Sequence, residues 1–402
     1  MLYNLAIVIY DFIVHLAAPF SRKPRKMMKG HWVVYELLRQ QVEKGEQYIW
    51  FHAASLGEFE QGRPLIEMIR EKYPNYKILL TFFSPSGYEV RKHYRGADIV
   101  CYLPFDKPRN VKKFLDIANP CMAFFIKYEF WKNYLDELHK RRIPVYSVSS
   151  IFRREQIFFK WYGGTYRNVL KDFDHLFVQN EASKRYLSKI GISRVTVVGD
   201  TRFDREEAKE LPLVEKFKGN NSFTFVAGSS WGPDEDLFLE YFNNHPEMKL
   251  IIAPHVIDEN HLVEIIGKLK RPYVRYTRAD ERNVLKADCL IIDCFGLLSS
   301  IYRYGEIAYI GGGFGVGIHN TLEAAVYGIP VIFGPKYQKF MEAVQLLEAK
   351  GAYSIKDYDE LKTLLDRFLT DEAFLRETGT NAGYYVTSNA GATEKIMHMI
   401  NF

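Results

Sequence analysis

The sequence lacks several features that would mark a specialised fold. It has no short-period repeat and no low-complexity tract, which excludes a solenoid and a mainly disordered chain. A formal net charge of +5 is too small to indicate nucleic-acid binding by itself. Its four cysteines show no spacing that would hold a metal or build a disulfide framework; they are Cys101, Cys121, Cys289 and Cys294. These absences favour an ordinary folded protein in a reducing, cytosolic environment.

The N-terminal segment is apolar, and a basic cluster follows it directly. A cleaved signal peptide would place its charges before the apolar run, so that interpretation is poor. Asn4, Asp11 and His15 fall on one narrow stripe of a helix, which suits a helix lying in or beside a membrane. The cluster would then meet anionic headgroups; it is made of Arg22, Lys23, Arg25, Lys26 and Lys29. The alternatives are packing on the protein's own core, or a spanning helix with the rest of the chain in the cytoplasm.

The chain is too long for one compact core, and at 402 residues two domains are expected. The polar segment 206–221, which contains Pro212 and Gly219, is the best candidate linker. We therefore predict a membrane-anchor helix over residues 1–21, one domain over 22–205 and a second over 222–402. The last helix is a candidate to pack back on the first domain.

Apolar segments of strand length alternate with helical patterns along the chain. Helices are expected at Gln61–Glu71, Asn110–Ile117 and Glu181–Ile190. This alternation is typical of βαβ units and parallel sheets, so we predict two Rossmann-like α/β domains around a cleft, with ligands at the carboxyl ends of strands. The expected strands are Tyr48–His52, Lys77–Phe82, Ile99–Leu103, Ala123–Ile126, Val145–Val148, His175–Val178 and Val195–Val198, then Phe223–Ala227, Lys249–Ala253, Cys289–Ile292, Ile307–Ile310 and Pro330–Phe333.

The most informative motif lies in the second half, after the strand Ile307–Ile310. Its glycines, which are Gly311, Gly312 and Gly313, let the backbone pass close to a ligand. His319 precedes the run Asn320–Tyr327, which predicts a helix whose first turn offers free N–H groups to a phosphate. Glu323, one turn in, is placed to accept hydrogen bonds from a ribose.

Other strand ends in this half carry small or donor-rich residues. Gly228, Ser229 and Ser230 would present N–H and hydroxyl donors to a phosphate. His255 follows the next strand; a lone histidine is usually structural, but this one shares its edge with the glycine- and serine-rich turns. Asp293 ends a third strand. Several such ends in one domain favour a nucleotide pocket.

In the first half, Glu58 follows the strand Tyr48–His52 and stands at the start of a helix. Ser55 and Gly57 precede it, and the glycine permits a tight turn. A carboxylate there could act as a general base toward a hydroxyl. The alternative is a capping acid that stabilises the helix dipole.

Three other loops of the first half could contact a ligand. Their candidate residues are Ser84 and Ser86, Lys127 and Glu129, and Arg153 and Arg154. The guanidinium groups could hold phosphate or carboxylate. An ordinary turn, surface charges and a solvated loop are the respective alternatives.

Together these motifs resemble those of 3-deoxy-D-manno-octulosonate (Kdo) transferases of lipopolysaccharide synthesis, which are GT-B glycosyltransferases. The matching motifs cover nearly the whole chain: His52–Glu58 with Ser55–Glu58 inside it, Ser84–Gly87, Tyr102–Asp106, Glu129–Asn133, Gly199–Asp204, Gly228–Ser230, Gly311–Gly313 and His319–Glu323. The resemblance implies an α/β GT-B fold of two Rossmann-like domains facing a central cleft, with an N-terminal membrane-associated helix. It also implies a location at the inner membrane, with the catalytic domains on the cytoplasmic face.

The resemblance assigns Glu58 as the catalytic base. It implies that the first domain receives the lipid A precursor, lipid IVA, and that the second binds CMP-Kdo. Acceptor contacts are expected from Ser55, Gly57, Ser84, Ser86, Lys127, Glu129, Arg153 and Arg154. Donor contacts are expected from Gly228, Ser229, Ser230, His255, Gly311, Gly312, Gly313, His319, Asn320 and Glu323. The expected partners are CMP-Kdo, the lipid A precursor and an anionic membrane surface, without nucleic acid.

The sequence departs from the family pattern at three places. The family commonly has Met-Glu-Thr-Glu where this chain has Ile126-Lys-Tyr-Glu129, so only Glu129 is carried over and Lys127 reverses a charge. The arginine that usually precedes the histidine matching His255 is missing, and Arg202 stands where a lysine is often found. These changes are consistent with a somewhat different acceptor.

The reaction implied is a single displacement with inversion. The only Asp-x-Asp pattern near a plausible site, Asp234–Asp236, opens a helix and is interpreted as N-terminal charge, so no metal and no cofactor are expected. A GT-B transferase that uses a UDP-sugar on a lipid-linked acceptor is one alternative, and a sugar-nucleotide epimerase is another. Competition between CMP and UDP donors would test the first alternative, and the N-terminal segment together with the Ser55–Glu58 motif argues against the epimerase.

Overall fold

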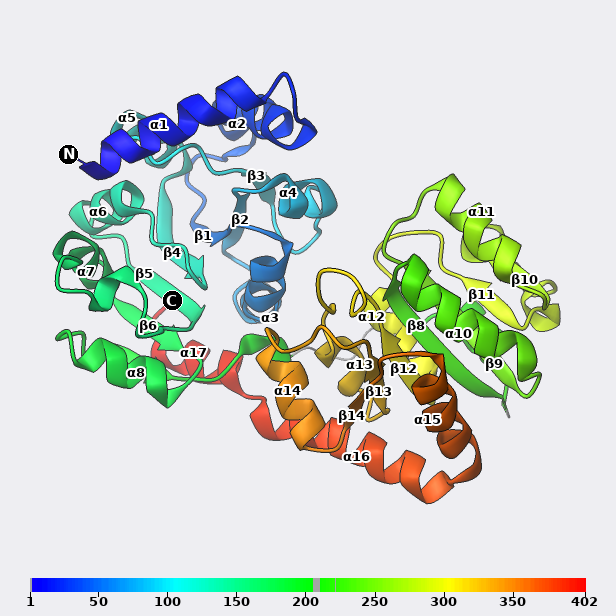
Figure 1. Ribbon diagram of the computed structural model, residues 1–402. Coiled ribbons are helices and arrows are strands. Elements are labelled where there is room, and N and C mark those ends of the chain that lie inside the picture. Colours follow the sequence, from blue (N-terminus) through cyan, green and yellow to red (C-terminus); the bar gives the residue numbers. More distant parts are fainter. Residues whose placement is uncertain (1, 205–209, 221) are drawn as a thin grey trace. The chain divides into compact units, whose positions relative to one another are not determined.

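The structure, a computed structural model, describes residues 2–204, 210–220 and 222–402 (Figure 1). Chain contacts divide it into two compact units. The first comprises Met1–Asp204 with Ala390–Phe402, and the second comprises Arg205–Asn389. The chain therefore enters the second unit once and returns to the first for its last helix.

The first unit is built on a seven-stranded parallel sheet in the order β3-β2-β1-β4-β5-β6-β7. Its strands are β1 (Tyr48–Ala53), β2 (Lys77–Phe82), β3 (Ile99–Tyr102), β4 (Pro120–Ile126), β5 (Val145–Ser150), β6 (His175–Val178) and β7 (Val195–Val197). Its helices are α1 (Leu2–Ala17), α2 (Arg22–Gln41), α3 (Leu56–Lys72), α4 (Pro85–Arg91), α5 (Pro108–Ala118), α6 (Lys132–Lys140), α7 (Gly164–Lys171), α8 (Glu181–Ser188) and α17 (Ala392–Met399), with short 3-10 helices η1 (Ile157–Phe159) and η2 (Thr201–Asp204).

The second unit has a parallel sheet of the same size in the order β10-β11-β9-β8-β12-β13-β14. Its strands are β8 (Phe223–Ser230), β9 (Met248–Pro254), β10 (Tyr273–Arg275), β11 (Cys289–Ile291), β12 (Ile307–Ile310), β13 (Val331–Phe333) and β14 (Ala352–Ser354). Its helices are α9 (Pro212–Lys218), α10 (Gly232–Asn244), α11 (Glu259–Lys268), α12 (Leu298–Ile301), α13 (Leu322–Ala325), α14 (Met341–Glu348), α15 (Tyr358–Thr370) and α16 (Glu372–Asn389), with η3 (Tyr276–Arg278), η4 (Val284–Lys286) and η5 (Tyr302–Tyr304).

The two predicted parallel α/β domains are confirmed, and each predicted strand is present. The edge strands β10 and β14 were not predicted. Strand β1 shows why the strands could be predicted from apolar runs in the sequence. All six of its residues are buried, because helices cover both faces of the sheet. Within the predicted linker, residues 206–209 and 221 lie outside the described residues. Residues 212–218 form helix α9, which buries Val214 and Phe217.

Helix α1 presents its polar stripe to its own domain. The Tyr3 hydroxyl donates to Asp106 Oδ2 at 2.5 Å, the Asn133 side chain donates to Asn4 Oδ1 at 2.8 Å, and Lys107 pairs with Asp11. Ile7, Val14 and Ala18 are buried.

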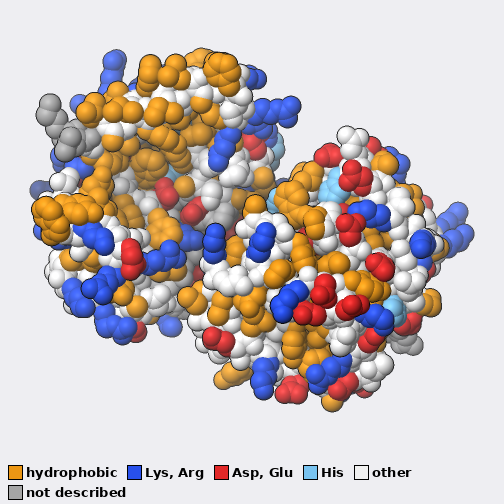
Figure 2. All heavy atoms as spheres, in the orientation of Figure 1, with side chains coloured by type: hydrophobic (Ala, Val, Ile, Leu, Met, Phe, Trp, Pro, Cys, Tyr) orange, Lys and Arg blue, Asp and Glu red, His pale blue; other side chains and the backbone are white. Residues whose placement is uncertain are grey.

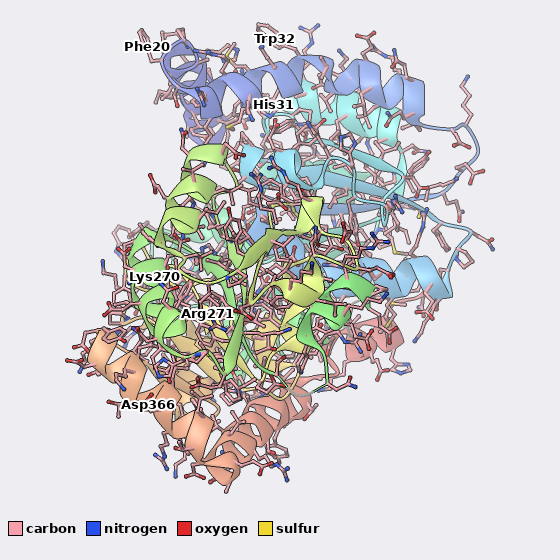
Figure 3. All side chains as sticks on the ribbon, turned by 90° about the vertical axis from the view of Figure 1, so that its right-hand side faces the viewer. Phe20, His31, Trp32, Lys270, Arg271 and Asp366 are labelled. Carbon is pink, nitrogen blue, oxygen red and sulfur yellow. The ribbon has the colours of Figure 1, made fainter. Side chains whose placement is uncertain are left out.

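The other side of α1 is apolar and exposed, with Phe12 62% accessible. The exposed residues of α1 and its neighbours are Leu5, Val8, Ile9, Phe12, Ile13, Leu16, Phe20, Trp32 and Val33. They form the apolar edge of the first unit in Figure 2, and Figure 3 shows Phe20 and Trp32 on the outer side of this edge. Within the described residues no single helix has the length and apolarity to cross a membrane, although α1 and α2 pass that test as a pair bent by 116°.

Candidate functional site

The predicted site residues of the first unit lie after β1, β2, β4 and β5, at the carboxyl ends of neighbouring parallel strands. Because such ends meet at one edge of a sheet, the loops after them can act on one ligand. Glu58 and Ser84 follow β1 and β2, and Lys127 and Arg153 follow β4 and β5.

Glu58 lies in the first turn of α3, half-buried, and accepts a hydrogen bond from the Ser55 hydroxyl. Its pKa is raised, first by burial and then by the charge of Glu129, while Lys127 opposes the rise. A carboxylate with a raised pKa is a better proton acceptor once it is ionised, which suits a general base.

Glu129 is held by a buried network that the sequence analysis missed. Its Oε2 lies 3.1 Å from His52 Nε2 and accepts the Trp131 indole N–H at 2.6 Å. The other ring nitrogen of His52 lies 2.9 Å from the Thr81 hydroxyl. His52 ends the apolar strand predicted just before Glu58. A histidine in such a buried strand was the signal that could have pointed to its hydrogen bond with Glu129.

Lys127 and the serine turn have defined backbone roles. Lys127 adopts a left-handed conformation, with φ of 66°, and its carbonyl accepts the Ser150 hydroxyl at 2.7 Å. Ser84 caps α4 by accepting the Ser86 N–H at 3.3 Å, and their hydroxyls lie 3.0 Å apart. The hydroxyls are exposed at the helix start, so capping does not prevent ligand contact.

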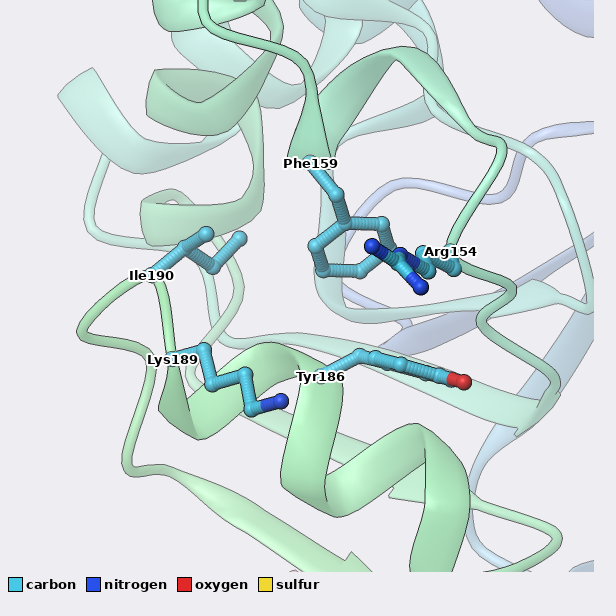
Figure 4. A pocket seen from close by; sticks show the side chains of 5 residues that line it. All are labelled: Arg154, Phe159, Tyr186, Lys189 and Ile190. Atoms are coloured by element: carbon cyan, nitrogen blue, oxygen red, sulfur yellow. The ribbon is translucent and has the colours of Figure 1, made fainter.

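The expectation for Gly57 needs correction, and the two predicted arginines differ in their surroundings. A tight turn does not require Gly57, because its φ is not positive and an added Cβ would meet only the Ser55 hydroxyl, at 3.9 Å. Arg153 and Arg154 do not share one environment. Arg153 lies close enough to Tyr128 to lower its pKa, although burial dominates and raises it, whereas Arg154 lines a separate pocket beside η1 and α8 (Figure 4).

In the second unit the glycine-rich turns are packed too closely for any side chain. A Cβ at Gly228 would lie 1.9 Å from the Tyr302 hydroxyl, and one at Gly311 would lie 2.2 Å from the Ser229 carbonyl oxygen. A Cβ at Gly313 would lie 2.6 Å from the backbone of Gly334. Gly312 has φ of 93°, which favours glycine. The turns after β8, β12 and β13 therefore form one backbone surface.

Two carboxylates of α10 accept hydrogen bonds from residues of these turns. The interpretation of Asp234–Asp236 as simple N-terminal charge is therefore corrected. Asp234 accepts the Gly312 N–H and the Tyr309 hydroxyl, each at 2.9 Å, and the Trp231 N–H at 3.0 Å. Glu235 accepts the Ser230 hydroxyl at 2.9 Å and pairs with His261. Only Asp236 is exposed.

Three aromatic rings stack beside the glycine turn. His255 stacks against both Trp231 and His319, with ring centroids 4.6 Å and 4.5 Å apart. The Trp231 indole N–H donates to His319 Nε2 at 3.4 Å. Burial lowers the pKa of His255, and burial together with His255 lowers the pKa of His319 to about 4, so both rings are neutral near pH 7. Trp231 was not predicted, although it directly follows the Gly228–Ser230 turn.

The predicted helix over Asn320–Tyr327 is shorter than expected. Regular helix covers only Leu322–Ala325, because Asn320 forms a side-chain turn in which its Oδ1 accepts the Leu322 N–H at 3.2 Å. The Asn320 amide donates to Glu323 Oε1 at 3.4 Å, so these two predicted donor residues are neighbours. A single helical turn offers few free N–H groups to an anion. In the glycine turn, the N–H groups of Gly311 and Gly312 already bond the Gly228 carbonyl oxygen and Asp234.

The acidic strand end at Asp293 has a structural role. Its carboxylate accepts from the Arg275 guanidinium at 2.9 Å and from the Thr277 N–H at 2.8 Å, and these bonds help to hold the pKa of Asp293 below its usual range despite partial burial. Among residues 2–204, 210–220 and 222–402, no group of three or more His, Cys, Asp and Glu side chains is placed to hold a metal ion.

Comparison with known proteins places this geometry in context. The family model for 3-deoxy-D-manno-octulosonic-acid transferase (kdotransferase) matches residues 31–205. The 3-deoxy-D-manno-octulosonic acid transferase of Aquifex aeolicus is 29% identical over 80% of this chain and 86% of its own length. That of Haemophilus influenzae is 25% identical over 88% of this chain and 86% of its own length.

Solved structures share the fold. The UDP-GlcNAc 2-epimerase of Neisseria meningitidis, bound to UDP-GlcNAc, aligns with a TM-score of 0.58 at 14% identity, over 88% of this chain and 99% of its own. Such low identity shows the fold alone. The two parallel sheets and this likeness show the GT-B-like architecture that the motifs implied.

Proposed function

Because the chain belongs to the 3-deoxy-D-manno-octulosonic acid (Kdo) transferase family, whose reaction is Kdo transfer in lipopolysaccharide synthesis, we propose its substrates and mechanism. The donor is CMP-Kdo and the acceptor is the lipid A precursor, lipid IVA. Transfer occurs by a single displacement with inversion at the anomeric carbon of Kdo. The family relationship to transferases, rather than a shared fold, separates this proposal from an epimerase reaction.

The position and surroundings of Glu58 are the observation that supports the proposed mechanism, in which Glu58 is the general base. It stands at the carboxyl end of β1 in a half-buried position, beside the fixed carboxylate of Glu129. Its raised pKa makes the ionised form a stronger proton acceptor. The proton comes from a sugar hydroxyl of the acceptor, and the resulting oxygen attacks Kdo as the bond to CMP breaks.

The second unit supplies the donor site in this proposal. The backbone around Gly311–Gly313 approaches the phosphate. Because the N–H groups of Gly311 and Gly312 bond the Gly228 carbonyl oxygen and Asp234, the Gly313 N–H is the amide of this turn that stabilises the negative charge growing on departing CMP. His319 is neutral and donates from the ring nitrogen that Trp231 leaves free. Glu323 lies beside Asn320, where it can receive the ribose hydroxyls.

No metal is required in this mechanism. The two carboxylates of α10 that could clamp a metal, Asp234 and Glu235, are committed to hydrogen bonds with the donor loops. Backbone amides and neutral histidine therefore provide the stabilisation of the leaving group.

A location on the cytoplasmic face of the inner membrane follows from the acceptor and from α1. The exposed apolar side of α1, with Phe12 and Leu16, is followed directly by the basic cluster of α2. This combination is typical of an interfacial helix on an anionic surface. It would hold the acceptor site next to a substrate that is itself a lipid.

The test is to incubate the purified protein with CMP-Kdo and lipid IVA and to weigh the lipid product by mass spectrometry. We expect one or more added Kdo units, and a loss of about 10²- to 10⁴-fold in rate for Glu58→Gln. Glu71→Gln, on the exposed end of the same helix, is the matched control and should retain full rate.

Each other outcome has a distinct meaning. Absence of product with CMP-Kdo, but product with a UDP-sugar, would overturn the donor assignment. Full activity of Glu58→Gln would retain the reaction but place the base elsewhere. Product formation from CMP-Kdo on a free sugar, without lipid, would overturn the acceptor assignment.

A further inference from the structure

The pocket beside η1 and α8 is a separate feature of the first unit. It has a volume of about 490 Å³ and is lined by Arg154, Phe159, Tyr186, Lys189 and Ile190. Figure 4 shows the Arg154 guanidinium beside the Phe159 ring and the Lys189 ammonium directed toward Tyr186. Two cations thus share a space whose walls are aromatic and aliphatic.

The walls of this pocket are held in place by ring packing, a hydrogen bond and a close glycine contact. The rings of Phe159 and Tyr186 lie 5.6 Å apart, and Phe158 beneath them is buried. The loop is tied to the start of α8 by a bond from the Phe152 N–H to the Ser183 hydroxyl at 2.8 Å. At its end, a Cβ on Gly163 would lie 1.8 Å from the Ile157 carbonyl oxygen, so the loop closes only with glycine.

The charge around the pocket is not neutralised by the protein. Residues 151–195, the basic segment, hold nine lysines and arginines against four acidic residues, a surplus equal to the net +5 of the whole chain. Within the described part of the chain, none of these nine cations forms an ion pair. Cations on other elements of the unit do so; Arg70 pairs with Asp98 and Arg141 with Asp116. An external anion would satisfy both pocket cations at once.

The same loop presents aromatic side chains to the outside. Trp161 is 90% and Tyr162 60% exposed, and their rings meet edge to face at 5.4 Å. Such large exposed aromatics beside cations are typical of the membrane–water interface. Tyr166, just beyond them, is close enough to Tyr3 to contribute to the rise in its pKa, which places this region near the start of α1.

We propose that this pocket binds the phosphate of a membrane phospholipid headgroup, held by Arg154 and Lys189, while Trp161 and Tyr162 lie at the interface. The first unit would then have two membrane contacts, one apolar through α1 and one headgroup-specific through the basic segment. This inference rests on the membrane association proposed above, but not on the identity of the sugar donor.

Vesicle binding of the full-length protein tests the proposal. Binding is measured by flotation with phosphatidylcholine vesicles, with and without phosphatidylglycerol. The pocket variant is Arg154→Gln with Lys189→Gln. Its control is Lys184→Gln with Arg185→Gln, which removes the same charge from exposed positions of α8 that do not line the pocket.

We expect phosphatidylglycerol to strengthen binding of the unaltered protein, and the pocket variant to lose about ten-fold or more of that gain. The control should lose less than about three-fold. Tryptophan emission should shift to shorter wavelength on these vesicles, and Trp161→Phe should reduce the shift, while Trp32 on the apolar edge accounts for the remainder. An equal loss in both double variants would mean general electrostatic attraction and would overturn the pocket. If the unaltered protein binds neither vesicle, the membrane association fails as well.

Two further arms distinguish the source of the phosphate. Inorganic phosphate is titrated into the protein without vesicles by calorimetry, and lipid IVA is added to phosphatidylcholine vesicles. Pocket-dependent binding of inorganic phosphate without any effect of phosphatidylglycerol would assign a free phosphate and overturn the lipid assignment. Pocket-dependent recruitment by lipid IVA, without any effect of phosphatidylglycerol, would assign the pocket to the acceptor and would also overturn the phospholipid assignment.

Discussion

The indole N–H of Trp231 donates to Nε2 of His319 at 3.4 Å, while His255 stacks against both rings. An accepted hydrogen bond at Nε2 requires the proton of a neutral imidazole to sit on Nδ1. The lowered pKa of His319, about 4, keeps the ring neutral at physiological pH. In the proposed donor site, Trp231 therefore orients His319 so that its Nδ1–H is the hydrogen-bond donor.

Replacing Trp231 tests this relationship. Trp231→Phe keeps an aromatic ring for the stack but lacks the N–H, and we expect kcat/KM for CMP-Kdo to fall about 3- to 10-fold, the value of one hydrogen bond. Trp231→Ala, which also loses the stack, should fall further. Thermal unfolding of the Phe variant should match that of the unaltered protein. A Phe variant with unchanged kcat/KM would show that the N–H does not position His319.

The charges around Glu58 predict opposite shifts of the pH profile. Glu129 raises the pKa of Glu58 and Lys127 lowers it, while burial gives the largest rise. Because a general base works only when ionised, kcat/KM should increase with pH through the pKa of Glu58. Glu129→Gln should move this rise to lower pH, and Lys127→Met should move it to higher pH.

The measurement is kcat/KM for Kdo transfer across the acid range, with Glu71→Gln as the charge-matched control on the same helix. The control should leave the midpoint of the profile in place. A shift of both variants in one direction, or of neither, would mean that the acid limb belongs to another group.

The parallel sheets could be predicted because their central strands are continuous apolar runs. Strands β2, β6 and β12 have the predicted bounds, since both faces of each are covered. Strands β10 and β14 have three residues each, and Tyr273 of β10 is exposed, so neither shows a readable apolar run. Short edge strands depend on the neighbour that pairs with them, which local sequence does not specify.

In the candidate site, too, features visible in the local sequence were predicted and features that depend on distant partners were not. The three glycines after β12 were identified because close backbone packing excludes any side chain, and that requirement is visible in the sequence. Asp234 was interpreted as helix charge because its partner, the Gly312 N–H, is 78 residues away. His52 and Trp131 were missed for a similar reason, since they act only by holding Glu129.

A buried histidine predicts how stability depends on pH. Both ring nitrogens of His31, a residue of α2, are buried without a hydrogen-bond partner in the described residues, and the ring meets Phe105 edge to face at 4.5 Å. Burial is the main cause that lowers its pKa to about 4. In the unfolded chain His31 is protonated below about pH 6.5, whereas in the folded chain it is protonated only below about pH 4. His31 therefore lowers the free energy of unfolding as the pH falls from about 6.5 to about 4.

His31→Phe should remove this loss. Relative to the unaltered protein, we expect the variant to gain about 3 kcal/mol in unfolding free energy between pH 7 and pH 4, from a shift of about 2.5 pKa units. Urea unfolding at several pH values measures the difference. A difference between the two proteins that is constant with pH would mean that His31 is protonated in the folded state.

The start of the last helix is capped by one carboxylate of the first unit, and the apolar side of this helix packs in the core of that unit. Asp204, the last residue of η2, accepts the Ala392 N–H at 3.2 Å and also bonds the N–H groups of Gly391 and Thr393. These are the otherwise unpaired donors at the start of α17, and an anion there also suits the helix dipole. The residue thus joins the point where the chain leaves the first unit to the point where it returns. Asp204→Ala should lower stability by about 1–2 kcal/mol, the usual cost of a lost cap, while Asp204→Asn should cost less because the amide oxygen still accepts.

Limited proteolysis identifies where this stability is lost. The C-terminal segment ends at Phe402, whose ring stacks on Tyr73 at 4.2 Å, so release of α17 should expose this aromatic end to chymotrypsin. We expect Asp204→Ala to be cut first near the C-terminus, with Asp204→Asn intermediate. Glu394→Gln, within α17 and outside the cap, is the control. If cleavage of Asp204→Ala instead began elsewhere in the first unit, the carboxylate would be stabilising η2 and not the returning helix, because only the N–H groups of residues 391–393 connect it to α17.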